Sequence, residues 1–131
     1  MTDQQLSLLP FYAGWGRYQQ HLVAAIAPLT VVRGNNDRGD WAAGISNAEF
    51  VQLGGIVIHA LHDIADLAID PRAAGVQVVV TGHSHKPSID TRDGVLYVNP
   101  GSAGPRRFRL PISVGELRID AGTITPTLVT L

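Results

Sequence analysis

The segment VVVTGHSHKP, residues 78–87, constrains the fold of this chain more than any other stretch. Four β-branched residues at 78–81 predict a buried strand, because such side chains pack well on a pleated sheet. Gly82 ends the strand, and His83 and His85 follow it one residue apart. Neutral imidazole is the most common metal ligand among side chains, and open α/β sheets keep their sites beyond the carboxyl ends of strands. The loop is therefore a candidate metal site, although an H-x-H pair taken alone fits an ordinary surface loop equally well.

The composition indicates one folded domain over residues 1–131. Hydrophobic residues make up 45% of the chain and charged residues 16%, which is typical of a globular protein. No apolar run reaches the ~18 residues that a membrane span needs, and no signal-peptide pattern opens the chain. Cysteine is absent, so any metal must be held by nitrogen and oxygen ligands. We expect a cytoplasmic protein with no membrane partner.

The charge pattern argues against stable nucleic-acid binding. The net charge is −1, whereas such binders carry a basic stripe. Nine of the ten basic residues are arginines, and several lie beside the motifs discussed below. Arginine forks suit phosphate oxygens, while solvated loop charge is the alternative for each of them.

The remaining patterns predict short helices and paired strands. Apolar spacing predicts a helix over 16–27 and a strand over 29–33. Asp70-Pro71 resembles a helix start, with Gly75 as its end. Hairpins are expected wherever small or turn-forming residues separate two apolar runs. Their turns lie at Gly54–Gly55, Arg92–Gly94 and Ala121–Gly122.

GHSH resembles the G-H-[ST]-H signature of the calcineurin-like metallophosphoesterases, in particular their small bacterial and archaeal phosphodiesterase branch. Three other stretches resemble that branch in the expected order, and the likeness runs from about residue 23 to the end. These stretches are VVRGNNDRG at 31–39, HDIADLAIDPRAAG at 62–75 and VLYVNPGSAGPRRFRLPISVGEL at 95–117. Residues 1–22 do not match and form an atypical amino-terminal segment.

The resemblance implies an α/β fold, α+β by some schemes, with two packed mixed β-sheets flanked by helices. It also implies that the site lies at the strand ends. The chain is expected to be an amino-terminally truncated, incomplete version of that domain.

The resemblance also implies a set of metal ligands, namely Asn35, His62, His83 and His85. Asn35 would offer its side-chain carbonyl, although a loop of this composition is also an ordinary turn. His59 competes with His62 for one ligand position. We favour His62, because relatives place a ligand histidine just ahead of a D-L-x-x-D-P stretch, and interpret His59 as a core or supporting histidine.

Three further residues are candidates for catalysis by the same resemblance. Asn36 holds the position that many relatives give to a histidine proton donor, and an amide cannot transfer a proton in the useful pH range. Substrates with good leaving groups are therefore favoured. Asp37 is expected to orient the loop by accepting backbone hydrogen bonds, and Arg106 to hold the phosphate. The N-P-G-S turn at 99–102 is expected to pack against the metal site.

Relatives bind two divalent cations with the help of carboxylates from D-x-H and G-D motifs near the amino terminus. Asp3 is the one acidic residue among residues 1–30, and Gly39-Asp40 follows the G-N loop. We therefore expect Mn²⁺, with Zn²⁺, Ni²⁺ or Fe as alternatives, in one site rather than the ideal two. The expected activity is hydrolysis of a small phosphodiester by a metal-activated hydroxide.

Three explanations of the missing motifs remain open. The chain is a truncated phosphodiesterase, a catalytically inactive member that works as a binding or interaction protein, or a subunit that takes ligands from another chain. Loss of the first strand would expose a sheet edge, which predicts self-association into a homo-oligomer.

Overall fold

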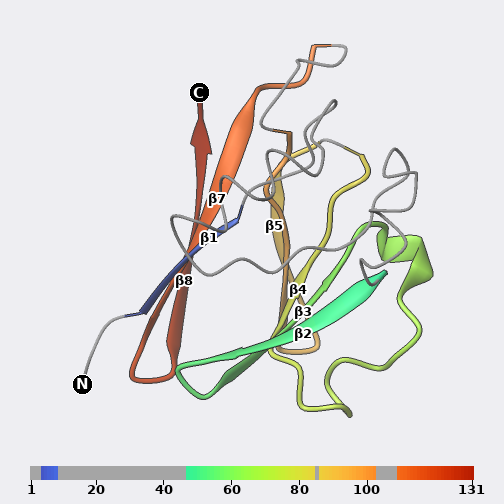
Figure 1. Cartoon of the computed structure of the whole chain (residues 1–131), viewed down its shortest axis with the longest axis vertical. Coiled ribbons are helices and arrows are strands. Elements are labelled where there is room, and N and C mark those ends of the chain that lie inside the picture. Colours follow the sequence, from blue (N-terminus) through green and yellow to red (C-terminus); the bar gives the residue numbers. More distant parts are fainter. Residues whose placement is uncertain (1–3, 9–46, 85, 103–108) are drawn as a thin grey trace, which may run out of the picture.

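The computed structural model describes residues 4–8, 47–84, 86–102 and 109–131 (Figure 1). Their elements are eight strands and one 3₁₀ helix: β1 Gln4–Leu8, β2 Ala48–Leu53, β3 Ile56–Leu61, η1 Ile64–Asp66, β4 Val78–Val80, β5 Ser88–Arg92, β6 Val95–Asn99, β7 Ser113–Asp120 and β8 Thr123–Thr130. The helix expected at 16–27 and the strand at 29–33 lie outside the described residues. Within the described residues, no helix is long and apolar enough to cross a bilayer.

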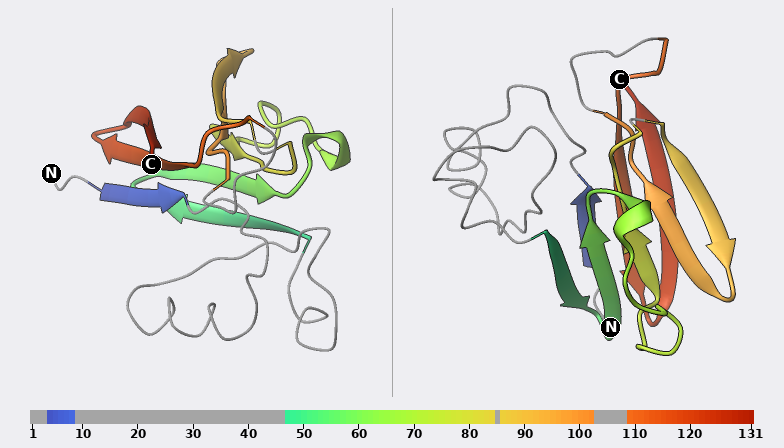
Figure 2. Two further views of the ribbon diagram at one scale, coloured as in Figure 1. Left: turned by 90° about the horizontal axis from the view of Figure 1, so that it is seen from above. Right: turned by 90° about the vertical axis from the view of Figure 1, so that its right-hand side faces the viewer.

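The strands form two sheets that pack against each other (Figures 1 and 2). The larger sheet has the order β2-β3-β4-β6-β5, in which β3, β4 and β6 run parallel and both edge strands run antiparallel to their neighbours. The smaller sheet, β1-β7-β8, is antiparallel throughout. This arrangement confirms the predicted α/β class with two packed sheets. The larger sheet is mixed as expected, whereas the described strands of the smaller sheet, expected to be mixed as well, are all antiparallel.

Alternate residues of the larger sheet divide between two apolar clusters. Those that face the smaller sheet form the first cluster with two β7 residues: Ile56, Ile58, Val78, Val98, Leu117 and Ile119. The opposite face forms a second cluster of Leu61, Val76, Val79 and Val95, against which Leu67 and Ile69 pack. Because β4 is covered on both faces, its sequence is a continuous apolar run rather than an alternating one.

Three tight turns confirm the hairpins expected from the sequence. Both central residues have positive φ at Gly54–Gly55 (58° and 79°), Asp93–Gly94 (51° and 77°) and Ala121–Gly122 (50° and 83°). A two-residue loop with both φ values positive is the type I′ pattern, whose twist matches that of the flanking strands. The turns join β2 to β3, β5 to β6 and β7 to β8.

The prediction of a helix between Asp70 and Gly75 was wrong, because the segment makes a single turn. Its ends are as expected: Asp70 Oδ1 accepts a hydrogen bond from the Ala73 N–H at 3.4 Å, and Gly75 has φ +77°. The Val76 N–H donates to Pro71 O at 2.8 Å and the Gly75 N–H to Arg72 O at 3.2 Å, which is the pairing of a Schellman motif. Val76 is buried in the second apolar cluster, so the chain must leave the turn there.

The amino-terminal strand β1 was not expected from the sequence. It lies at the edge of the smaller sheet, antiparallel to β7, with Gln4 opposite Ile119 and Leu8 opposite Gly115. Its sequence, QQLSL, is short and mostly polar. Strand formation in such a segment depends on the neighbouring strand more than on intrinsic propensity.

Candidate metal centre

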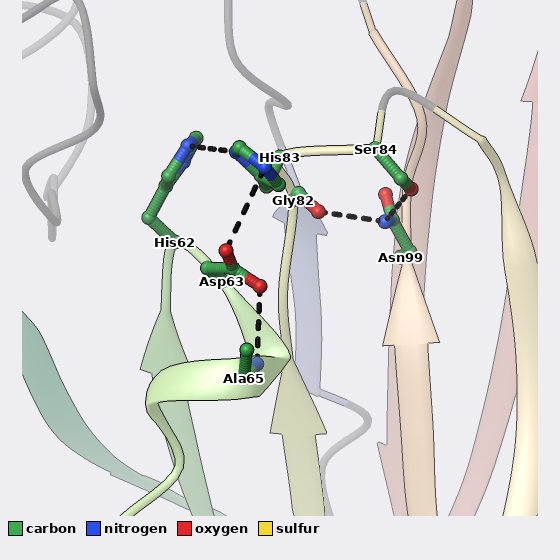
Figure 3. A network of polar contacts seen from close by, with 7 residues as sticks. All are labelled: His62, Asp63, Ala65, Gly82, His83, Ser84 and Asn99. Atoms are coloured by element: carbon green, nitrogen blue, oxygen red, sulfur yellow. Dashed lines mark hydrogen bonds and ion pairs between the residues drawn. The ribbon is translucent and has the colours of Figure 1, made fainter.

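The candidate centre lies where the parallel strands β3, β4 and β6 end at one edge of the larger sheet (Figure 3). His62 directly follows β3, His83 comes three residues after β4, and Asn99 is the last residue of β6. Parallel strands bring their carboxyl ends together. Residues 15 to 21 positions apart in the sequence therefore become neighbours.

The imidazoles of His62 and His83 face each other at this edge. His62 Nε2 and His83 Nδ1 are 3.2 Å apart, and the two rings meet edge to face at 83°. Two nitrogens bound to one tetrahedral Zn²⁺ at about 2.05 Å would be about 3.3 Å apart. The pair can share a proton in one tautomer, and it also fits two ligand atoms of a single cation.

Asp63 lies beside the other ring nitrogen of His83 (Figure 3). Its Oδ2 lies 3.6 Å from His83 Nε2, and its Oδ1 accepts the Ala65 N–H at 3.0 Å as the cap of η1. A carboxylate beside Nε2 favours the tautomer with the proton on that nitrogen. The Nδ1 lone pair then points to His62, which is the state that a metal ligand requires. Asp63 was not expected from the sequence, where its one signal is its position directly after a candidate ligand.

The backbone at His83 adopts a conformation that is rare for a residue with a side chain. Its φ is +67°, and the Ser84 N–H donates to Gly82 O at 2.8 Å. A hydrogen bond between residues two apart around a positive φ defines a strained γ-turn. Such strain costs about 1–2 kcal/mol and persists where the surrounding structure enforces it, often at functional sites.

Asn99 is the residue that holds this strained loop in place. Its side chain is buried, and its Nδ2 donates to Gly82 O at 3.0 Å and to Ser84 Oγ at 3.1 Å. These two acceptors flank His83 (Figure 3). The Gly82 N–H in turn donates to His62 O at 2.8 Å. The expectation that the N-P-G-S turn packs against the site agrees with these contacts.

Gly101 gives the N-P-G-S turn its shape. Its φ is +88°, and an added Cβ would collide with Ser113 Oγ and crowd Pro87. The Ser113 hydroxyl donates to Pro100 O at 2.8 Å, and the Gly101 N–H donates to Asn99 Oδ1 at 2.9 Å. Only glycine combines this backbone conformation with so close an approach.

His59 makes its contacts on the neighbouring strand. It is 5% exposed, its Nδ1 lies 3.2 Å from Glu49 O, and its ring stacks on Phe50 with centroids 4.3 Å apart. Of the two competing histidines, His62 is therefore the one beside His83.

The structure brings together two of the four residues predicted to bind metal. Asn35 and His85 lie outside the described residues, and so do the three catalytic candidates, Asn36, Asp37 and Arg106. The described part of the chain has no group of three or more His, Cys, Asp or Glu residues that could hold a metal ion. His62 and His83 are thus two neighbouring imidazoles, and a metal site would require further ligands.

Comparisons with known proteins agree on the type of domain. The model of the calcineurin-like phosphoesterase superfamily domain matches residues 17–122. A probable metallophosphoesterase of Methanocaldococcus jannaschii is 29% identical over 104 residues, which cover 72% of this chain and 51% of that protein. The chain thus spans about half the length of this curated relative.

Solved structures share the fold. A conserved uncharacterized protein of Streptococcus pneumoniae, described as a predicted phosphoesterase, superposes with a TM-score of 0.72 at 20% identity, covering 99% of this chain and 91% of that one. Vps29 of Entamoeba histolytica, complexed with Zn²⁺, gives 0.65 at 24%, covering 88% and 76%. An archaeal phosphodiesterase gives 0.64 at 22%, covering 80% and 70%.

Proposed function

The chain belongs to the calcineurin-like phosphoesterase superfamily, and from that premise we propose that it binds one divalent cation through His62 and His83 and hydrolyses a small phosphodiester. The observation that carries the proposal is the 3.2 Å separation of His62 Nε2 and His83 Nδ1. When bound, a divalent cation supplies Lewis-acid polarisation of the phosphoryl oxygen and a water of lowered pKa. In the overall reaction a water oxygen bonds to phosphorus, one ester P–O bond breaks, and the water proton passes to the released alcohol.

The described residues contribute orientation. The Asp63 carboxylate favours a proton on His83 Nε2, in which case Nδ1 presents a lone pair beside His62. Asn99 holds both sides of the γ-turn that carries His83. The His83 ring is thus positioned by a carboxylate on one side and a backbone clamp on the other.

We assign the remaining roles to residues named by the family motifs. Asn35 and His85 would complete the ligand set, Asp37 would order the loop, and Arg106 would hold the phosphate. Because Asn36 cannot donate a proton, the proposed substrate has a good leaving group. Mn²⁺ is the first cation to test, followed by Zn²⁺, Ni²⁺ and Fe²⁺, which imidazole ligands also suit.

One observation favours an alternative function, that of a binding protein without turnover. Residues 1–30 contain a single acidic residue, Asp3, and no D-x-H motif. Two cations at ~3.5–4 Å repel each other strongly, and bridging carboxylates normally offset that repulsion. We therefore propose one cation, and metal binding without hydrolysis would support the alternative.

The test combines metal analysis with an activity assay on the purified full chain. We expect one equivalent of bound Mn²⁺ or Zn²⁺ and metal-dependent hydrolysis of bis(p-nitrophenyl) phosphate. His62→Ala and His83→Ala should each lose both properties, whereas Thr125→Ala, an exposed change on β8, should lose neither. Absence of metal binding in the wild type would reject the proposal.

A further inference from the structure

A recess of about 180 Å³ opens beside His83 and runs along β5 and β6. Asp63 and His83 line one end, and Asp90, Arg92 and Tyr97 line the other. Asp90 lies directly opposite Tyr97 in the sheet, so both project from the same face. The recess therefore connects the candidate metal centre to a second group of polar side chains.

The side chains at the far end hold one another in place. Arg92 Nε donates to Asp90 Oδ2 at 2.8 Å, and the guanidinium lies 4.9 Å from the centre of the Tyr97 ring. Arg92 lowers the pKa of Asp90 through this hydrogen bond. Every residue of β5 is exposed, so packing of the core does not account for this arrangement. The carboxylate of Asp90 holds the edge of the guanidinium, and the Tyr97 ring lies against its face. A guanidinium held in this way is already oriented for a ligand.

The dimensions limit what could bind here. Tyr97 lies two residues before the end of β6, which places it about 7 Å from the strand end at about 3.3 Å per residue. The volume equals that of about six water molecules at about 30 Å³ each. A glycerol- or pentose-sized group on a phosphorus beside His83 fits this space.

The chemistry of the walls favours hydroxyl groups over a second phosphate. Arg92 and Asp90 compensate each other's charge, so this end has little net attraction for an anion. Together they place N–H donors next to carboxylate acceptors, and a hydroxyl both donates and accepts. We propose that the recess binds a hydroxyl-bearing substituent, a glycerol or pentose group, of the phosphodiester substrate. This inference rests on the proposed function.

Two chromogenic diesters with the same leaving group test the inference. The probes are glyceryl p-nitrophenyl phosphate and methyl p-nitrophenyl phosphate, with kcat and KM measured separately for the full chain. We expect the glyceryl diester to have a kcat/KM about tenfold higher, mainly through KM, because hydrogen bonds to charged groups are worth at least that factor. Arg92→Ala and Asp90→Asn should bring the ratio to about one, while Thr125→Ala should leave it unchanged.

The outcomes separate this inference from the proposed function. Hydrolysis of both diesters at equal kcat/KM would overturn the proposed binding role of the recess and leave the proposed function unaffected. If neither diester is hydrolysed, the proposed function fails, and NMR titration of the wild type with the glyceryl and methyl diesters decides about the recess. Shifts of the Asp90, Arg92 and Tyr97 signals with the glyceryl diester alone would support it. Equal shifts or none would overturn it.

Discussion

Replacing Asp63 with asparagine tests whether a carboxylate orients the proposed metal ligand. Asparagine has nearly the same shape and is an equally good cap, so the hydrogen bond from the Ala65 N–H to Oδ1 should survive. The change removes the negative charge 3.6 Å from His83 Nε2. The expected result is weaker metal binding with unchanged folding.

The expected loss of metal affinity follows from the distance between Asp63 and His83 and from the exposure of their side chains. A bound cation would place partial positive charge on the neutral His83 imidazole; two full unit charges near 4 Å interact by about 1 kcal/mol in water and about 4 kcal/mol at an effective dielectric constant of 20, which sets an upper limit here. The side chains of His83 and Asp63 are 47% and 27% exposed, so solvent screening favours the lower part of that range. A loss of about 1.4 kcal/mol corresponds to tenfold weaker binding, the lower end of what such outer partners contribute.

Calorimetric titration with Zn²⁺ and Mn²⁺ measures the metal affinity, and thermal unfolding of the metal-free protein measures the stability. Asp63→Ala is the matched comparison, because it loses the cap as well and should unfold about 1 kcal/mol more easily. Both variants should lose affinity to a similar extent. Binding by Asp63→Asn as tight as in the wild type would refute the role assigned to the carboxylate.

Four further predictions concern the backbone and charges around the site. His83→Gly should be about 1 kcal/mol more stable to urea than His83→Ala, because glycine takes a φ of +67° without strain, and equal stabilities would contradict the γ-turn. Gly101→Ala should lose about 2–4 kcal/mol in the same assay through its positive φ and the steric collision; a loss below 1 kcal/mol would argue against the observed packing. Asn99→Ala should lose about 2 kcal/mol, since it leaves the half-buried Gly82 O and the buried Gly101 N–H without this partner. It should also weaken metal binding, whereas unchanged affinity would argue against its role at the site. Arg92→Ala should raise the pKa of Asp90 toward its ordinary value, as measured by NMR titration. The Asp90–Arg92 pair stabilises the fold at neutral pH, and that contribution should disappear as the pH falls through the lowered pKa of Asp90.

The hairpins and the buried central strand could be predicted because their causes are local. Asp93-Gly94 and Gly54-Gly55 tolerate positive φ, which selects the turn and hence the register of the flanking strands. The apolar run of β4 indicates burial on both faces. Family motifs favoured His62 over His59 as the candidate ligand. In the structure His62 lies beside His83, whereas His59 contacts Glu49 on the neighbouring strand.

Other features could not be predicted because they depend on partners that are distant in the sequence. The helix expected after Asp70 stops after one turn because Val76 enters the core. Strand β1 forms because β7 offers it an edge.

By itself, the sequence determined which side chains and turns are available: two imidazoles beside a strand end, glycines where φ is positive, and β-branched runs for the sheet. Only the tertiary structure decided that His62 and His83 come within 3.2 Å of each other and that Asp63 lies beside them. The physical reason is that parallel pairing of β3 and β4 aligns their ends. The position of His83 is then set by the hydrogen bonds from Asn99 and by the γ-turn, and neither leaves a local pattern in the chain.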